Sequence, residues 1–163
     1  MFDMATAKKR TVGSGIGSID TISVCVDKMD GSIRDYQHRT PQWTVGKNFD
    51  STGAVGPVFV TADELPAGAR GLRLETRLNG EVVQSSNTGH MIFDVATLIS
   101  ITSEAMTLLP GDLIVTGTPA GVGHSRSPKL YMKPGDVVEV EIEGIGVLRN
   151  SIVDESLIAI EVA

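Results

Sequence analysis

A polar segment between positions 30 and 49 carries residue types that metal-dependent and oxyanion-stabilising enzymes use. Asp30 offers a carboxylate, Gln37 an amide and Lys47 an ammonium group, and few apolar residues among them lie at helix or strand spacing. A carboxylate can ligate a divalent cation, and a partly desolvated lysine can bind an anionic substrate or an oxyanion. Because sites usually lie on polar loops of an otherwise apolar chain, this segment is the first candidate.

Each of these side chains also has a structural interpretation. Asp30 is followed by Gly-Ser, which is common in turns, and Lys47 could be an ordinary surface lysine. Arg34 and Asp35 are adjacent and could brace the loop through each other or through the backbone. From local sequence alone the structural interpretation is favoured for each residue, and the functional one stays open.

A glycine-rich loop from Thr116 to Gly123 is the second candidate. It lacks a Lys-Ser/Thr pair, so it is not a phosphate-binding P-loop. Its glycines, among them Gly117, allow a backbone to approach a ligand, and Thr118 could donate a hydrogen bond to a carboxylate. A plain β-turn explains the same residues equally well.

Other clusters of titratable residues favour structural interpretations. Glu139, Glu141 and Glu143 alternate with Val and Ile, which favours a half-buried strand with its acidic side in water over a metal cluster. The three histidines are widely separated and show no metal-ligand spacing. No Ser-His-Asp or Cys-His set can be assembled from the sequence.

The elements that must position these residues are mainly strands. Alternating or β-branched runs predict strands over 21–26, 57–61, 72–78, 81–85, 113–116, 137–143 and 147–153, of which 113–116 is expected to be buried. Asn79-Gly80 predicts a two-residue hairpin turn, and 94–106 predicts the one good helix, capped by Asp94. A short helical turn is expected over 36–40. Two Pro-Gly-Asp sequences, at 110–112 and 134–136, predict turns that lead into strands.

Length and composition predict one mainly β domain. The chain of 163 residues can bury one core; we expect an irregular segment over 1–19 and a single domain over 20–163, in which the sheet curls over the helix. A net charge of -6 without a basic block argues against nucleic acid as a partner. No apolar run approaches a membrane span, the start lacks a signal peptide core, and the single Cys25 is expected to be a buried thiol. A cytoplasmic protein is expected.

An ordered set of motifs resembles the fumarylacetoacetate hydrolase family over roughly residues 20 to 155. The motifs are Asp30-Gly-Ser-Ile-Arg-Asp-Tyr-Gln37, Trp43-Thr-Val-Gly-Lys-Asn-Phe49, Gly56-Pro57, Leu78-Asn-Gly80, Met91-Ile-Phe93, Pro110-Gly-Asp-Leu-Ile-Val-Thr-Gly-Thr-Pro-Ala-Gly-Val-Gly123, and Lys133-Pro-Gly-Asp136 through Gly144-Ile-Gly146. The chain is most similar to the branch of 2-hydroxyhepta-2,4-diene-1,7-dioate isomerases, fumarylpyruvate hydrolases and acylpyruvate hydrolases.

The resemblance implies a mixed β-roll, a homodimer, and an enzyme that binds Mg²⁺ or Mn²⁺ through three carboxylates. Asp30 matches one metal ligand, and Gln37 and Lys47 match positions that contact the substrate and its oxyanion. Thr118 matches the position that binds the substrate carboxylate, and Gly117 and Arg34 complete the expected substrate-binding set. The implied substrate is a small 2-oxo acid, chelated through its keto and carboxylate oxygens, and the metal would stabilise an enolate.

The chain departs from the family pattern before Asp30. The family's Glu-x-Glu metal ligands are absent, and Asp3 is at best an imperfect surrogate. The chain therefore resembles an N-terminally shortened C-terminal core, in which metal binding is expected to be weak or absent unless a partner chain supplies ligands. Two functions follow: a hydrolase, isomerase or decarboxylase of 2-oxo acids, or a catalytically impaired remnant that serves as a dimerising subunit.

Overall fold

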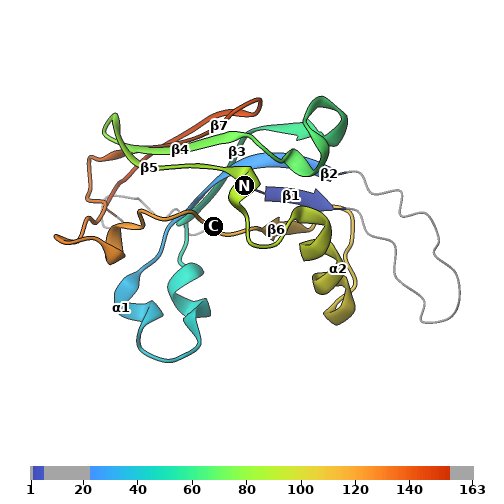
Figure 1. Ribbon diagram of the computed structural model, residues 1–163. Helices are drawn as coiled ribbons and strands as arrows, with labels where there is room; N and C mark the ends of the chain where they lie inside the picture. The colour runs from blue at the N-terminus through green and yellow to red at the C-terminus, as the bar shows by residue number, and fades with distance from the viewer. Residues whose placement is uncertain (1, 6–22, 155–163) are drawn as a thin grey trace, which may run out of the picture.

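The computed structural model describes residues 2–5 and 23–154, with side chains for residues 31–154, and shows two four-stranded sheets (Figure 1). The strands are β1 (Phe2–Ala5), β2 (Ser23–Asp30), β3 (Gly53–Thr61), β4 (Arg73–Leu78), β5 (Glu81–Asn87), β6 (Leu113–Val115), β7 (Val137–Ile142) and β8 (Gly146–Ser151). The α-helices are α1 (Arg34–Gln37) and α2 (Val95–Ala105), and the short 3-10 helices are η1 (Trp43–Lys47), η2 (Ala62–Glu64), η3 (Ala67–Ala69), η4 (Thr88–His90) and η5 (Gly123–Ser125). Every pairing between these strands is antiparallel. The expected fold class, mainly β with one main helix, is confirmed.

The first sheet has the strand order β3-β2-β1-β6. Strand β1 occupies an inner position, where it pairs with β2 on one side and β6 on the other. The expectation of an irregular start is therefore wrong for Phe2–Ala5, while residues 6–22 and the C-terminal residues 155–163 lie outside the described part of the chain. The side chain of Cys25, within β2, also lies outside it.

The second sheet has the order β5-β4-β7-β8 and contains both expected hairpins. Asn79 and Gly80 both have positive φ, at 53° and 84°, which confirms the two-residue turn between β4 and β5. The closing hairpin pairs β7 with β8. Figure 1 shows β4, β5 and β7 on one side of the molecule and β1 with β6 on the other, with α2 beneath β6.

The carboxylates of β7 are bound by arginines of β4. Arg77 donates to Glu139 at 3.0 Å and to Glu141 at 2.7 Å, and Arg73 also reaches Glu141 at 2.7 Å. Hydrogen bonds from Arg77 and Arg73 lower the pKa of Glu141 from its usual value. Buried Val138, Val140 and Ile142 alternate with these carboxylates. The half-buried strand is confirmed, and ion pairs across the sheet, rather than water alone, satisfy its acidic face.

The core lies between the two sheets. Its larger cluster is formed by Val60, Ala69, Leu72, Leu74, Ile142 and Ile145, and a second cluster by Val138, Val140 and Leu148. Contacts of β3 with β8 and of β2 with β7 bring the two sheets face to face. Burial of these apolar side chains is the main force that holds the sheets together.

The helix predicted from the sequence is confirmed at α2, whereas the predicted helical turn is displaced along the chain at α1. Asp94 caps α2 by accepting from the backbone N–H of Thr97 at 2.8 Å, as predicted. The short helical turn lies over Arg34–Gln37, so it begins two residues earlier than expected and ends three residues earlier. Strand β6 is an edge strand with Leu113 and Val115 exposed at 43% and 47%, so the expectation of a buried strand there is wrong. No helix in the described ranges is long and apolar enough for a membrane crossing.

The two Pro-Gly-Asp sequences each form a turn with the same hydrogen bond. The carboxylate of Asp112 accepts from the backbone N–H of Leu109, and that of Asp136 accepts from the backbone N–H of Lys133, both at 2.7 Å. The glycines between have φ of 99° and 92°, which only glycine adopts readily. Asp136 accepts a further bond from the amide of Asn79 at 2.8 Å, so the second turn is tied to the β4–β5 hairpin.

The variant Asp136→Asn is expected to lower the midpoint of thermal unfolding at pH 7. The hydrogen bond from Asn79, followed by that from the Lys133 backbone, lowers the pKa of Asp136. A carboxyl with a depressed pKa contributes stability above the unfolded aspartate pKa of about 3.9, and loses it as the pH falls through its lower folded pKa. The difference from wild type should therefore narrow in acid. Asp112→Asn, which lacks a partner like Asn79, is the control and should have a smaller effect at pH 7; equal effects would contradict this account.

Candidate functional site

The first half of the candidate site is a small unit made of α1 and η1. The backbone N–H of Ile33 donates to the carbonyl of Gly46 at 2.9 Å, and the rings of Tyr36 and Phe49 meet edge to face at 4.7 Å. A Cβ on Gly46 would lie 2.6 Å from both the backbone nitrogen and the Cβ of Gln37. Only glycine permits this approach, so the sequence Val-Gly-Lys fixes η1 directly against α1.

Gln37 is buried and held by Arg34. The Gln37 side chain is 2% exposed, and its Oε1 accepts from Arg34 Nη1 at 2.5 Å. The sequence favoured a bracing role for Arg34 with Asp35 or the backbone. The structure shows the bracing role, but the partner is the Gln37 side chain. This bond occupies Oε1 of the amide, which leaves Nε2 as the hydrogen-bond donor of Gln37.

Asp30 precedes this unit in the chain, and Lys47 is its last residue. Asp30 is the last residue of β2, opposite Gly53 of β3, and the chain passes directly from it into α1. Lys47 is the last residue of η1 and is partly buried. The side chain of Asp30 lies outside the described part of the structure, so its predicted role as a metal ligand stays a prediction.

The glycine-rich loop is the second half of the candidate site, and β5 holds it in place. Gln84 Nε2 donates to Thr118 Oγ1 at 3.1 Å and to the carbonyl of Pro119 at 2.9 Å. Arg126 Nε donates to the carbonyl of Gly121 at 2.9 Å, and its Nη2 donates to the carbonyl of Val83. The sequence does not indicate a role for Gln84 or Arg126, because their partners are distant in the chain. Thr118 lies 34 positions from Gln84, and Val83 lies 43 positions from Arg126.

This arrangement determines what Thr118 can offer. Because Oγ1 accepts from Gln84, the hydroxyl hydrogen of Thr118 is directed to another acceptor. Gly117 has a φ of 101°, which glycine adopts readily, and no atom lies within 4 Å of the position that a Cβ would take. Together they form an exposed backbone and hydroxyl surface that suits a carboxylate.

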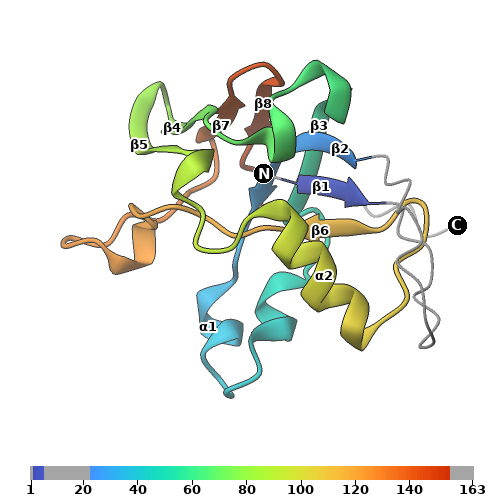
Figure 2. The same cartoon turned by 45° about the vertical axis from the view of Figure 1, so that its right-hand side comes forward.

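A pair of histidines joins the two halves. The rings of His38, after α1, and His124, in η5, stack with centroids 5.0 Å apart and an interplanar angle of 28°. The orange segment that carries η5 lies beside α1 in both ribbon views (Figure 2). The sequence separates these histidines by 86 positions, so their spacing gives no sign of this contact. Gln37 and Thr118 are thus carried by segments that are in contact.

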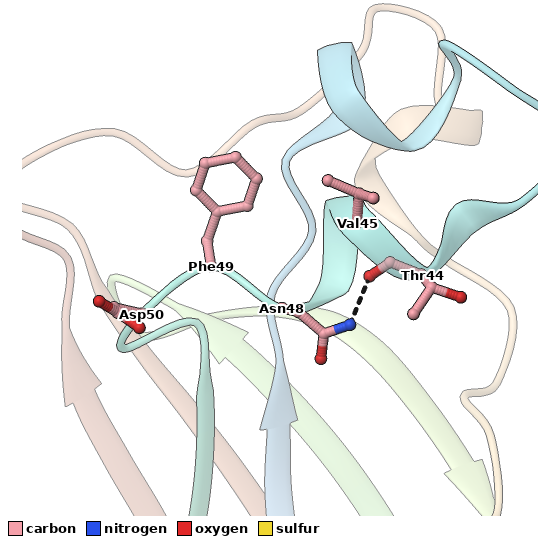
Figure 3. A pocket seen from close by; sticks show the side chains of 5 residues that line it. All are labelled: Thr44, Val45, Asn48, Phe49 and Asp50. Atoms are coloured by element: carbon pink, nitrogen blue, oxygen red, sulfur yellow. Dashed lines mark hydrogen bonds between the residues drawn. The ribbon is translucent and has the colours of Figure 1, made fainter.

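The structure also contains a surface hollow of about 450 Å³ beside η1 (Figure 3). Thr44, Val45, Asn48, Phe49 and Asp50 line it, and the Asn48 amide donates to the Thr44 carbonyl at 2.7 Å. None of the predicted site residues lines this hollow. All of its lining comes from a single turn of chain, so we do not assign it to the candidate site.

The described side chains do not fit a three-carboxylate metal centre. Among them, no group of three His, Cys, Asp or Glu residues is placed so that it could hold a metal ion. The strongest acidic cluster, Glu139 with Glu141, is engaged by Arg77 and lies on the second sheet. The side chain of Asp30, the expected metal ligand, lies outside this described set.

The variant Gly46→Ala is expected to lower the free energy of unfolding by about 1–3 kcal/mol, the usual cost of overpacking. The added methyl group would meet backbone atoms of Gln37, which cannot move aside without parting η1 from α1. Urea unfolding measures the effect. Val45→Ala, at the exposed neighbouring position, is the control and should change stability by no more than about 0.5 kcal/mol. Equal stability of the two variants would show that the close approach is not essential.

Comparisons with known proteins identify the family to which the chain is similar. The family described as fumarylacetoacetate (FAA) hydrolase C-terminal matches residues 19–153. Oxaloacetate tautomerase Fahd2a, mitochondrial, from Rattus norvegicus is 47% identical over 125 residues, which cover 76% of this chain and 40% of that protein. The structure of fumarylacetoacetate hydrolase from psychrophilic Exiguobacterium antarcticum has a TM-score of 0.72 and 43% identity, covering 82% of this chain and 45% of that one.

A third relative was solved with ligands. Fumarylpyruvate hydrolase from Pseudomonas aeruginosa, in complex with Mn²⁺ and pyruvate, has a TM-score of 0.69 and 30% identity, covering 83% of this chain and 54% of that one. The chain thus spans about half the length of the relatives it matches. The family match covers most of the chain and includes both halves of the candidate site, so the chain belongs to the fumarylacetoacetate hydrolase family and corresponds to its C-terminal domain.

Proposed function

We propose that this protein is a hydrolase- or isomerase-type enzyme that acts on a small, acylpyruvate-like 2-oxo acid. The observation that carries the proposal is the family match over residues 19–153, which spans both segments of the candidate site. Relatives named as a tautomerase of oxaloacetate and a hydrolase of fumarylpyruvate support 2-oxo acids as the substrate class. Hydrolysis, isomerisation and decarboxylation of such acids share an enolate, so one site can serve any of the three.

The proposed roles follow from what each side chain offers. Thr118 and the backbone at Gly117 bind the substrate carboxylate through the hydroxyl hydrogen that Gln84 leaves available. Gln37 donates from its Nε2 to the keto oxygen, with Arg34 fixing the amide in the correct orientation. Lys47 stabilises the negative charge that develops on that oxygen. Arg34 also adds a positive charge next to Gln37.

Mg²⁺ or Mn²⁺ is the implied cofactor, as the relative solved with Mn²⁺ suggests. When bound, such an ion would supply Lewis-acid stabilisation of the enolate. Asp30 is the proposed ligand from this chain. Since the described side chains offer no three-ligand group, metal affinity is expected to depend on ligands from elsewhere or on a chelating substrate.

A second candidate function is a catalytically impaired, dimerising subunit. Large apolar side chains on β3, among them Val58 and Phe59, are exposed and would suit a homodimer interface. We propose a homodimer, located in the cytoplasm, for either function. Light scattering after size-exclusion chromatography tests the dimeric state.

Turnover assays separate the two functions. The full chain is incubated with acylpyruvates and oxaloacetate, with and without Mg²⁺ or Mn²⁺, and calorimetry follows metal binding in parallel. The enzymatic proposal predicts measurable turnover that Asp30→Ala abolishes. Absence of turnover, together with no metal uptake at millimolar concentration, would favour the impaired subunit.

A further inference from the structure

The stacked histidines connect the two segments that the proposed site needs. His38 directly follows Gln37, and His124 lies in η5 at the end of the glycine-rich loop that carries Thr118. Their rings are 5.0 Å apart at an interplanar angle of 28°. Such a stack holds the two loops together as long as the interaction between the rings is favourable.

Further contacts hold each ring of the pair. His124 Nδ1 lies 3.0 Å from the hydroxyl of Tyr131, which orients the imidazole. The ring of His38 contacts that of Trp43 in η1 edge to face, with the ring centroids 6.1 Å apart and an interplanar angle of 75°. The pair is therefore anchored on both sides, by η1 through Trp43 and by the chain after η5 through Tyr131.

Among the described residues, the charged groups that act on His124 are positive. Lys129 and Arg34 face His124, together with His38 itself. Among the side chains that the structure describes, no carboxylate forms an ion pair with Lys129 or Arg34. Desolvation, followed by Lys129, Arg34 and His38, lowers the pKa of His124 below its usual value. The surroundings thus favour the neutral ring, and protonation would place like charges in contact.

We propose that His38 and His124 are a positioning pair whose neutral stack holds the Gln37 segment against the Thr118 segment, and that protonation separates the two loops. The pair acts through the substrate-binding residues and need not touch the substrate. Its effect on catalysis rests on the proposed function, whereas its effect on loop contact does not. At neutral pH the loops are joined; in mild acid they part.

Hydrogen exchange tests the loop contact without any assay of activity. Peptides covering 33–47 and 117–131 are followed between pH 5 and 8, with correction for the intrinsic pH dependence of exchange. Loss of an aromatic stack should raise their exchange by about two- to tenfold as the pH falls through the His124 pKa, below about 6.5. The double variant His38→Phe/His124→Phe keeps two stacking rings that cannot be protonated, so its exchange should not change with pH. The same pH response in both proteins would overturn the proposal.

NMR titration of the ring protons of the three histidines gives the electrostatic readout. The variant His38→Phe removes a neighbour that lowers the His124 pKa, so the His124 pKa should rise in this variant. Tyr131→Phe removes the Nδ1 contact but leaves the stack, so exchange in that variant should still respond to pH. His90→Phe, at the end of η4, is the control for loss of a histidine and should match wild type. An unchanged His124 titration in His38→Phe would contradict the coupling.

Kinetics distinguish this proposal from the proposed function. In an active protein, kcat/KM should fall on the acid side in wild type but not in the double phenylalanine variant. His124→Ala should raise KM by about two- to tenfold at pH 7.5, the range expected for a lost aromatic pair. An acid limb that persists in the double variant would overturn the positioning role. No turnover in any variant, with the exchange response intact, would refute the proposed function and leave the loop contact supported.

Discussion

Replacing Lys47 by methionine is expected to lower kcat for a 2-oxo acid by about 10²–10³-fold, the range found when one oxyanion-stabilising donor is removed. Methionine keeps an unbranched side chain of similar length but removes the ammonium charge. Lys47 ends η1 and is partly buried next to the segment that carries Gln37, so the charge lies in a partly desolvated position. Steady-state kinetics with the substrate that shows the highest turnover measure the effect.

The matched control is Lys133→Met. Lys133 is exposed, and in the turn before β7 its backbone N–H, not its side chain, bonds Asp136. This variant should retain the activity of wild type. If both lysine variants lose activity alike, or if Lys47→Met keeps full kcat, the proposed role of Lys47 is wrong. Circular dichroism of both variants should match wild type, because neither change removes a core contact.

The second large effect is on stability. Ile142→Ala is expected to lower the free energy of unfolding by about 2–5 kcal/mol, because it leaves a cavity in the core. Ile142 is 0% exposed and is the largest fully buried side chain among the described residues. It lies at the end of β7, opposite Leu74 of β4, within the larger core cluster. Urea unfolding followed by circular dichroism measures the change.

Val147→Ala is the control for this substitution. Val147 lies on β8, the neighbouring strand, and is 40% exposed, so its truncation opens no buried cavity. Its effect should stay within about 0.5 kcal/mol. A loss of less than 1 kcal/mol for Ile142→Ala would mean that the region between the sheets is less tightly packed than the structure shows.

Local signals in the sequence predicted local structure well. The positive φ required at Asn79 and Gly80, the Asp94 cap and the two Pro-Gly-Asp turns each depend on residues within a few positions of one another. The alternation of Val and Glu in β7 predicted which face would be buried. Such features follow from backbone sterics and from hydrogen bonds that a short segment makes with itself.

Contacts between distant segments could not be predicted in the same way. The place of β1 inside the first sheet depends on pairing with β2 and β6, which no periodicity in four residues reveals. The bond from Gln84 to Thr118 and the stack of His38 on His124 join residues from different sheets and loops. The family resemblance therefore suggested candidate residues of the site, but the sequence did not reveal the groups that hold them in place.

A crystal structure of the full chain with Mg²⁺ and oxalate, a bidentate mimic of an enolised 2-oxo acid, tests the central claim most directly. The account predicts that oxalate lies between the two loops, with one carboxylate within hydrogen-bonding distance of the Thr118 hydroxyl and Lys47 Nζ near the other. The Asp30 carboxylate should face the same space. If the side chains of Asp30, Lys47 and Thr118 face separate surfaces, or if oxalate binds elsewhere, the enzymatic account is contradicted.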